Sequence, residues 1–144
     1  MSENPFSNYN IDIPKIYQED IKSFSRTGGT ITNYELAPFE RQIDFWYCAF
    51  MIAVKKKLAP VKGEDTYNAT SASILSSNPS RITHIQAVFL SLHNDLSALA
   101  DHRRVFEFAI QMANAGIPHL IQILKDTEDR PIWNILDELE SYSR

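Results

Sequence analysis

Histidine and acidic side chains are the residues of this sequence best suited to bind a metal ion or to transfer protons. His93, Asp95, Asp101 and His102 lie close together in the chain, and all four are of types that ligate metals. Their spacing does not place two histidines at i and i+4 on one helix face, where two imidazoles can share an ion. We therefore expect a polar linker here, and we predict no catalytic residue, no metal ligand and no cofactor. A small metal-dependent hydrolase stays as the third-ranked function.

The single cysteine and one further histidine lie among apolar residues. Cys48 falls in the run FWYCAFMIAV, where burial raises the pKa of a thiol and suppresses the reactive thiolate. His84 lies between core positions of a predicted helix, so we expect it to be partly buried and structural. One cysteine forms no intramolecular disulfide, the start of the sequence lacks signal-peptide character, and the longest apolar run is about half of the roughly 20 residues that span a bilayer. We expect a cytoplasmic protein that does not associate with membranes.

Two groups of basic residues are candidate contacts for nucleic acid or for an acidic partner. They are Lys55, Lys56, Lys57 and Lys62 after an apolar helix, and Arg103 and Arg104, next to His102, at the start of another. Lysines at a helix C-terminus interact favourably with the helix dipole, whereas arginines at an N-terminus need a compensating acid or an anionic ligand. Asp101 and Glu107 are the candidate acids. The net charge of −4 argues against a surface devoted to phosphates, so a nucleic-acid-binding module using residues 55–62 and 102–104 ranks second.

Aromatic residues provide the main indication of function. They make up 11% of the chain, which exceeds what a minimal helical core needs. Four of them, Tyr9, Tyr34, Tyr67 and Tyr142, fall in stretches that we expect to be exposed. Because tyrosine often anchors protein interfaces, this pattern favours a protein that works by binding another protein subunit. A second copy of the chain is a further candidate partner.

The elements that position these residues are predicted to be helices. A chain of 144 residues, 44% of them hydrophobic, has enough apolar side chain for one core but not for two. We predict an all-α fold, a compact single-domain array of five to six helices over residues 11–144, preceded by a flexible N-terminal arm over residues 1–10. One small hairpin, in residues 27–36 or 59–70, is the allowed exception.

Apolar residues recur at helical spacing in six segments. The predicted helices cover residues 13–24, 38–58, 80–93, 103–115, 118–126 and 131–139. The second should be central and nearly surrounded, because its apolar residues cover almost every side. Gly116 is expected to end the fourth helix and Pro118 to begin the fifth. In the last helix, the residues expected to pack inward are Ile132, Trp133, Ile135, Leu136 and Leu139.

Two stretches resemble a known family. The stretch DFWYCAFMIAVKKKLAPVKGEDTYN (44–68) looks like the small accessory proteins of bacterial DNA phosphorothioation (Dnd-type) defence clusters, and RRVFEFAIQMANAGIPHLIQIL (103–124) is similar in style to a segment of the same proteins. Together they cover about a third of the chain and carry no catalytic signature. The resemblance implies an accessory subunit of a prokaryotic anti-phage or DNA-modification system. Our leading hypothesis is a non-enzymatic accessory or adaptor subunit in an anti-phage defence or DNA-processing complex.

Overall fold

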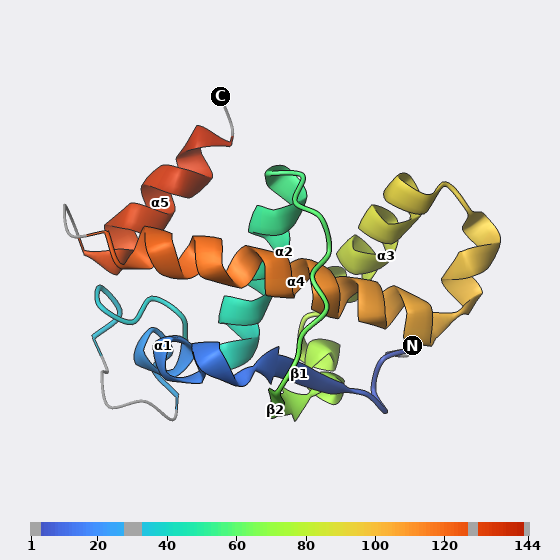
Figure 1. The fold of residues 1–144 in the computed structure, drawn as a ribbon, viewed down its shortest axis with the longest axis horizontal. Helices are drawn as coiled ribbons and strands as arrows, with labels where there is room; N and C mark the ends of the chain where they lie inside the picture. The colour runs from blue at the N-terminus through green and yellow to red at the C-terminus, as the bar shows by residue number, and fades with distance from the viewer. Residues whose placement is uncertain (1–3, 28–32, 127–129, 143–144) are drawn as a thin grey trace.

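The protein folds into a mainly helical domain with one small sheet (Figure 1). The computed structural model describes residues 4–27, 33–126 and 130–142. Its strands and α-helices are β1 (Asn10–Pro14), α1 (Gln18–Ser23), α2 (Gln42–Lys55), β2 (Thr66–Ser71), α3 (Pro79–His93), α4 (His102–Leu124) and α5 (Pro131–Ser141). Short 3-10 helices cover Lys15–Tyr17, Ala72–Ser77 and Leu96–Ala100. The prediction of a mainly helical fold is confirmed, but the sheet means that the fold is not purely all-α.

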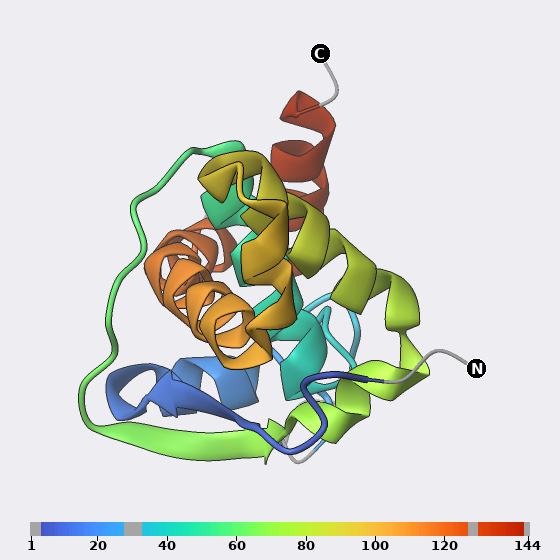
Figure 2. The same cartoon turned by 90° about the vertical axis from the view of Figure 1, so that its right-hand side faces the viewer.

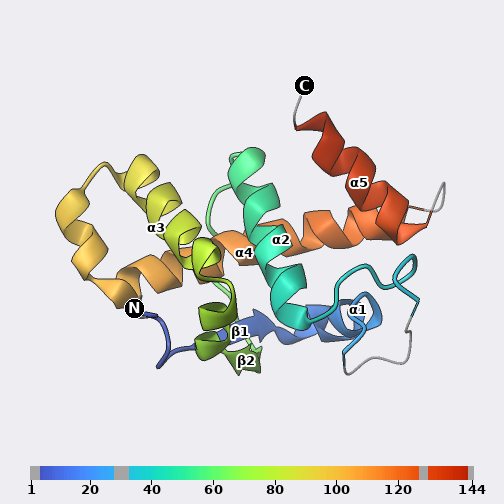
Figure 3. The same ribbon diagram turned by 180° about the vertical axis from the view of Figure 1, so that it is seen from behind.

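Helix α2 runs through the centre of the molecule, as its apolar pattern predicts (Figure 3). Its buried residues are Ile43, Phe45, Trp46, Cys48, Ala49, Phe50, Ile52 and Ala53. The helix ends before the lysine cluster is complete, because Lys57 adopts a positive φ of 56°. The Lys57 N–H then donates to the Val54 carbonyl at 3.2 Å and the Leu58 N–H to the Ala53 carbonyl at 2.9 Å. This pair of bonds is a Schellman motif, which satisfies carbonyls at the helix end.

One continuous helix, α4, replaces the two helices predicted over residues 103–126. Gly116 does not end the helix. It lies against α2, where an added Cβ would come within 1.9 Å of the Ala49 carbonyl oxygen. Pro118 interrupts the hydrogen bonds inside α4 and its side chain is exposed, yet the helix continues because Leu120, Ile121 and Leu124 are buried beyond it. Packing therefore overrides the local preference of both residues.

The N-terminal segment is packed against the domain over its described part. Phe6 is fully buried, and the Asn4 side-chain amide donates to the Ala72 carbonyl at 3.0 Å. Residues 4–10 therefore do not form the predicted arm, since a buried phenylalanine ties them to the core; residues 1–3 lie outside the described part. Strand β1 follows, so the predicted helix over 13–24 is present only as the 3-10 turn and α1.

The two strands pair over a long sequence separation. Strand β1 runs antiparallel to β2, with Ile13 opposite Tyr67 and an irregularity between Ile11 and Asp12. The sheet lies below α4, and the connection from α2 to β2 runs down the outside of the molecule (Figure 2). The small sheet is therefore not a hairpin within 59–70, and part of the other candidate segment, residues 28–32, lies outside the described residues.

Helix α3 and helix α5 begin at the prolines that their sequences predict. Helix α3 spans Pro79–His93 and α5 spans Pro131–Ser141. The predicted inward face of α5 is wrong in part, because Ile135 is buried whereas Trp133, Leu136 and Leu139 are exposed. Helix α5 contacts mainly α4 and projects from one end of the domain (Figure 1), and these three side chains keep 38% to 49% of their surface exposed. Among the described helices, none is long and apolar enough to cross a bilayer.

Replacement of Gly116 tests the close approach of α2 and α4. Alanine for glycine inside a helix normally stabilises it by about 1 kcal/mol. We expect Gly116→Ala to have the opposite sign and to lower the free energy of unfolding by about 3 kcal/mol or more, because the new Cβ meets backbone that no rotamer change can move. Urea denaturation measures this difference.

Pro118→Ala is the matched control on the same helix. It restores a backbone donor at an exposed position, so we expect the free energy of unfolding to rise by about 1 to 3 kcal/mol. A Gly116→Ala protein as stable as the wild type would contradict the packing described for the crossing.

Candidate functional site

The four predicted interface tyrosines differ in exposure. Tyr34 is 59% exposed. The other three are partly buried: Tyr9 packs on Phe106 with ring centroids 5.2 Å apart, and the Tyr67 hydroxyl donates to the side-chain oxygen of Gln42 at 2.9 Å. The Tyr142 hydroxyl donates to the carboxylate of Glu138 at 2.7 Å. Of the four, Tyr34 is therefore the one that presents most of its side chain to a partner.

The predicted basic residues are distributed over several surfaces. At the end of α2, the Lys56 ammonium pairs with Glu138 of α5 at 3.3 Å. At the start of α4, Arg104 lies over the ring of Phe89, 5.6 Å from its centroid, and Arg103 lies over the ring of Tyr9 at 5.4 Å. Lys55 lies near enough to His84 to lower its pKa, and Lys57 is the left-handed residue of the helix cap.

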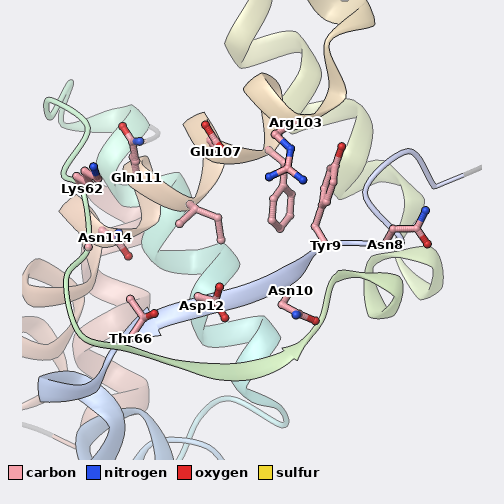
Figure 4. A pocket seen from close by; sticks show the side chains of 13 residues that line it. Asn8, Tyr9, Asn10, Asp12, Lys62, Thr66, Arg103, Glu107, Gln111 and Asn114 are labelled. Carbon is pink, nitrogen blue, oxygen red and sulfur yellow. The ribbon is translucent and has the colours of Figure 1, made fainter.

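Two of these cations, Lys62 and Arg103, line the same pocket as Tyr9. The pocket lies between α4, β1 and the segment that leads into β2 (Figure 4), and its volume is about 420 Å³. Pockets of about 300 to 1,000 Å³ accommodate small-molecule ligands. A larger hollow of about 720 Å³ lies between residues 4–8 and α3 and includes His102, but its lining contains none of the buried polar atoms that lack a partner.

One wall of this pocket is a single face of helix α4. On α4 the lining residues are Arg103, Phe106, Glu107, Ile110, Gln111 and Asn114, which recur at i, i+3, i+4, i+7, i+8 and i+11. Such spacing puts side chains on one face of a helix. The opposite wall is residues 61–66, which we call the strap. It is attached to α4 at two points, because the Val61 N–H donates to the Gln111 carbonyl at 2.9 Å and the Asn114 amide donates to the Val61 carbonyl at 3.1 Å.

Four charged side chains surround the pocket without neutralising one another. They are Lys62 and Arg103, which are positive, and Asp12 and Glu107, which are negative. Among the described residues, none of these four side chains takes part in an ion pair or a hydrogen bond. The pocket therefore presents charges of both signs to whatever enters it.

The histidine and acidic side chains around residues 93–102 make stacking and helix-capping contacts with residues near them in the sequence. His93 stacks on Phe89 with ring centroids 4.1 Å apart. The Asp95 carboxylate accepts from the Ser97 backbone and hydroxyl, and the hydrogen bond from Ser97 lowers the pKa of this carboxyl. Asp101 accepts from the Arg104 N–H at 3.2 Å and so caps α4. Within the described part of the chain, no three histidine, cysteine or acidic side chains are grouped as metal ligands would be.

The remaining titratable candidates are Cys48 on α2 and His84 on α3, which lies beside Tyr47 of α2. His84 Nδ1 hydrogen-bonds the Tyr47 hydroxyl, and burial, followed by the charge of Lys55, lowers the pKa of the imidazole. Burial also raises the pKa of the Cys48 thiol to about 12, with a smaller opposing effect of Arg81. Both residues are partly or fully buried, as expected from their position among apolar residues.

The sequence analysis did not identify Asp12 or Asn114, and of these two Asn114 is the buried one. It is 3% exposed, and its Oδ1 is one of two buried side-chain atoms, among the described residues, that lack a hydrogen-bond partner. The available signal was a polar residue on the apolar face of α4, among Ala113, Ala115 and Ile117. Polar side chains at such positions are rarely buried without a specific role.

Comparison of the chain with protein-family models, with curated protein sequences and with solved structures gave no match. The function is therefore argued from the residues and their geometry.

Thiol labelling tests the environment of Cys48. At pH 8 we expect the folded protein to react with an aromatic disulfide far more slowly than the urea-unfolded chain, because a pKa of about 12 instead of 9.0 leaves about a thousandfold less thiolate. The chain has a single cysteine, so the absorbance of the released thiol reports this residue alone. Equal rates in the folded and unfolded states would contradict the burial of Cys48.

Proposed function

We propose that the protein is a non-enzymatic helical subunit that binds another protein, and that α5 carries the contact surface. The observation that supports this proposal is that three large exposed apolar side chains lie together on one helix. Trp133 is 49% exposed, Leu136 45% and Leu139 38%. Contiguous exposed apolar patches on soluble proteins commonly mark interaction sites.

The three side chains form a stripe along α5. They are spaced three residues apart, so each lies next to the following one on the helix surface. A tryptophan at one end is the type of residue that most often dominates binding energy at an interface. We call Trp133, Leu136 and Leu139 the α5 stripe.

A second segment extends the apolar surface near the start of α5. The Ile132 N–H donates to the Glu35 carbonyl at 3.1 Å, and the Arg130 guanidinium pairs with the Glu35 carboxylate at 2.6 Å. Glu35 lies between Tyr34 and Leu36, which are 59% and 40% exposed. The contacts of Glu35 therefore keep Tyr34, a predicted interface residue, next to the start of α5.

The charges beside the stripe define the chemistry of the partner. Asp137 is exposed on α5, and the whole chain has a net charge of −4. The complementary partner surface is an apolar groove with basic residues at its rim. The assignment to a prokaryotic anti-phage defence or DNA-processing complex rests on the sequence resemblance of residues 44–68 and 103–124 alone, and the cytoplasmic location rests on the single cysteine and the start of the sequence.

Nucleic-acid binding has less support from the arrangement of the basic residues. Lys56 is paired with Glu138, and Arg103 and Arg104 lie on different aromatic rings. In the pocket, Lys62 and Arg103 are accompanied by two carboxylates that repel phosphate. The metal-dependent hydrolase has the least support, since Asp95 and Asp101 cap helices.

Substitution of the α5 stripe tests the proposal. The tagged full chain and its Trp133→Ala, Leu136→Ala variant are used to purify partners from the source cells, at low and high salt and with nuclease. We expect a protein that is recovered with the wild type in high salt and after nuclease, and that is lost with the variant. Loss of two such anchors costs about 2 kcal/mol or more, which weakens binding by about thirtyfold.

The control variant is Leu92→Ala, Leu96→Ala. These residues are 61% and 72% exposed, in the last turn of α3 and in the following 3-10 helix, which lie at the end of the molecule opposite α5 (Figure 1). The variant therefore removes similar apolar area without touching α5. Retention of the partner by this variant supports the proposal. A partner that both variants retain, or that nuclease releases, would overturn it.

A further inference from the structure

An unpartnered amide oxygen lies at the floor of the pocket beside α4. Asn114 is 3% exposed and lines the pocket, and its Oδ1 has no hydrogen-bond partner. Figure 4 shows its side chain between Lys62 and Thr66, where the strap passes α4. Buried acceptors in proteins are almost always satisfied, so an orphan in a pocket wall indicates a donor that arrives from outside.

The orientation of this amide is set by the strap. The Asn114 Nδ2 donates to the Val61 carbonyl at 3.1 Å. Rotation of the amide by half a turn would place Oδ1 against that carbonyl, and two acceptors would then face each other. The oxygen is therefore held on the side away from Val61, and no described residue donates to it.

The charged side chains of the pocket indicate a ligand with both signs of charge. Asp12 lies on β1, and Arg103 lies with Tyr9 at the end of the pocket opposite Asn114 (Figure 4). Lys62 and Glu107 are exposed and oppositely charged. A purely anionic ligand would meet two carboxylates, and a purely cationic ligand would meet a lysine and an arginine. Only a zwitterion is complementary to both pairs.

The size and the lining of the pocket indicate which zwitterions would fit it. A free amino acid carries both charged groups on the same carbon atom and fills a small part of about 420 Å³. Amide side chains of Asn8, Asn10 and Gln111 also line the pocket, and Figure 4 shows Gln111 beside Lys62 and Asn8 beyond Tyr9. Amides donate to and accept from peptide groups, so they suit a ligand with a polar backbone between its two charged ends.

We propose that this pocket binds an unblocked short peptide, or a similarly elongated zwitterion, with its ammonium group at Asp12 and Asn114 Oδ1 and its carboxylate at Arg103. The ammonium donates to the orphan amide oxygen and pairs with the Asp12 carboxylate. The carboxylate accepts from the Arg103 guanidinium, which the ring of Tyr9 already supports. The site is distinct from the α5 stripe and does not depend on it.

Binding is measured with three peptide pools and one inorganic anion. The pools contain the same tripeptides in unblocked, N-acetylated and C-amidated form, and phosphate is the anion. Native mass spectrometry of the full chain detects the complex, and titration calorimetry gives the Kd of the best binder. We expect a one-to-one complex with the unblocked pool and none with either blocked pool or with phosphate. Absence of binding to the unblocked pool, equal binding to a blocked pool, or equal binding to phosphate would each overturn the proposal.

Charge-removing variants locate the site. Asp12→Asn and Arg103→Gln should each raise the Kd of the best binder by about tenfold or more, because each removes a charge-assisted contact. The matched controls are Glu19→Gln and Lys22→Gln, exposed residues of α1 that do not line the pocket. They should leave the Kd unchanged. Equal effects of the pocket and control variants would place the binding elsewhere and contradict the proposal.

Gly63→Ala tests the floor of the pocket without removing a polar group. An added Cβ at this position would lie 2.9 Å from Asn114 Nδ2 and 3.4 Å from Pro14 and Thr66, so it displaces the amide. We expect this variant to lose peptide binding while it retains the wild-type circular dichroism spectrum. The Trp133→Ala, Leu136→Ala variant should bind the peptide like the wild type, which separates this site from the proposed partner surface. A Gly63→Ala protein with unchanged Kd would contradict the role of Asn114.

Discussion

The close crossing of α2 and α4 is the constraint on which the rest of the structure depends. At the crossing, Gly116 lies against the Ala49 carbonyl with no room for a side chain. Ala53 and Ala113 nearby are fully buried, so both helices present small residues to each other and their backbones approach closely. Close packing of this kind maximises dispersion contacts and excludes water from the aromatic residues of α2. Helix α4 must therefore remain continuous through Gly116 and Pro118.

Because of the crossing, α4 has one face that stabilises the core and another that lines the pocket. One face of the helix packs on α2, and residues of the other face line the pocket beneath the strap. Asn114 connects the two roles, because it is buried next to the core and still holds the strap through Val61. The pocket wall is thus part of the rigid framework, which favours preorganised recognition. Helix α5, by contrast, contributes one buried residue, Ile135, and leaves its apolar stripe exposed.

The sequence predicts the elements whose signals are local. Prolines mark the starts of α3 and α5, and the apolar periodicity of residues 43–54 identifies the central helix. The same local rules misplace the end of α4, because Gly116 is required by a contact with Ala49, 67 positions earlier in the chain. Strand β1 is missed for the same reason, since it is short and its partner lies more than 50 residues away. For the pocket, Lys62, Arg103 and Tyr9 are recognised as candidates, but only the fold shows that they meet, and Asn114 is hidden by its position in an apolar stretch.

Native-state hydrogen exchange tests the central claim most directly, that a rigid α2–α4 unit supports more loosely attached binding elements. Amides of α2 and α4 around Ala49 and Gly116 should exchange only through global unfolding, with an opening free energy equal to that from urea denaturation. Amides of α5 should exchange through local opening at a lower free energy, because most of its apolar side chains are exposed. Opening free energies at the crossing that are lower than those of α5, or equal to them, would contradict the account.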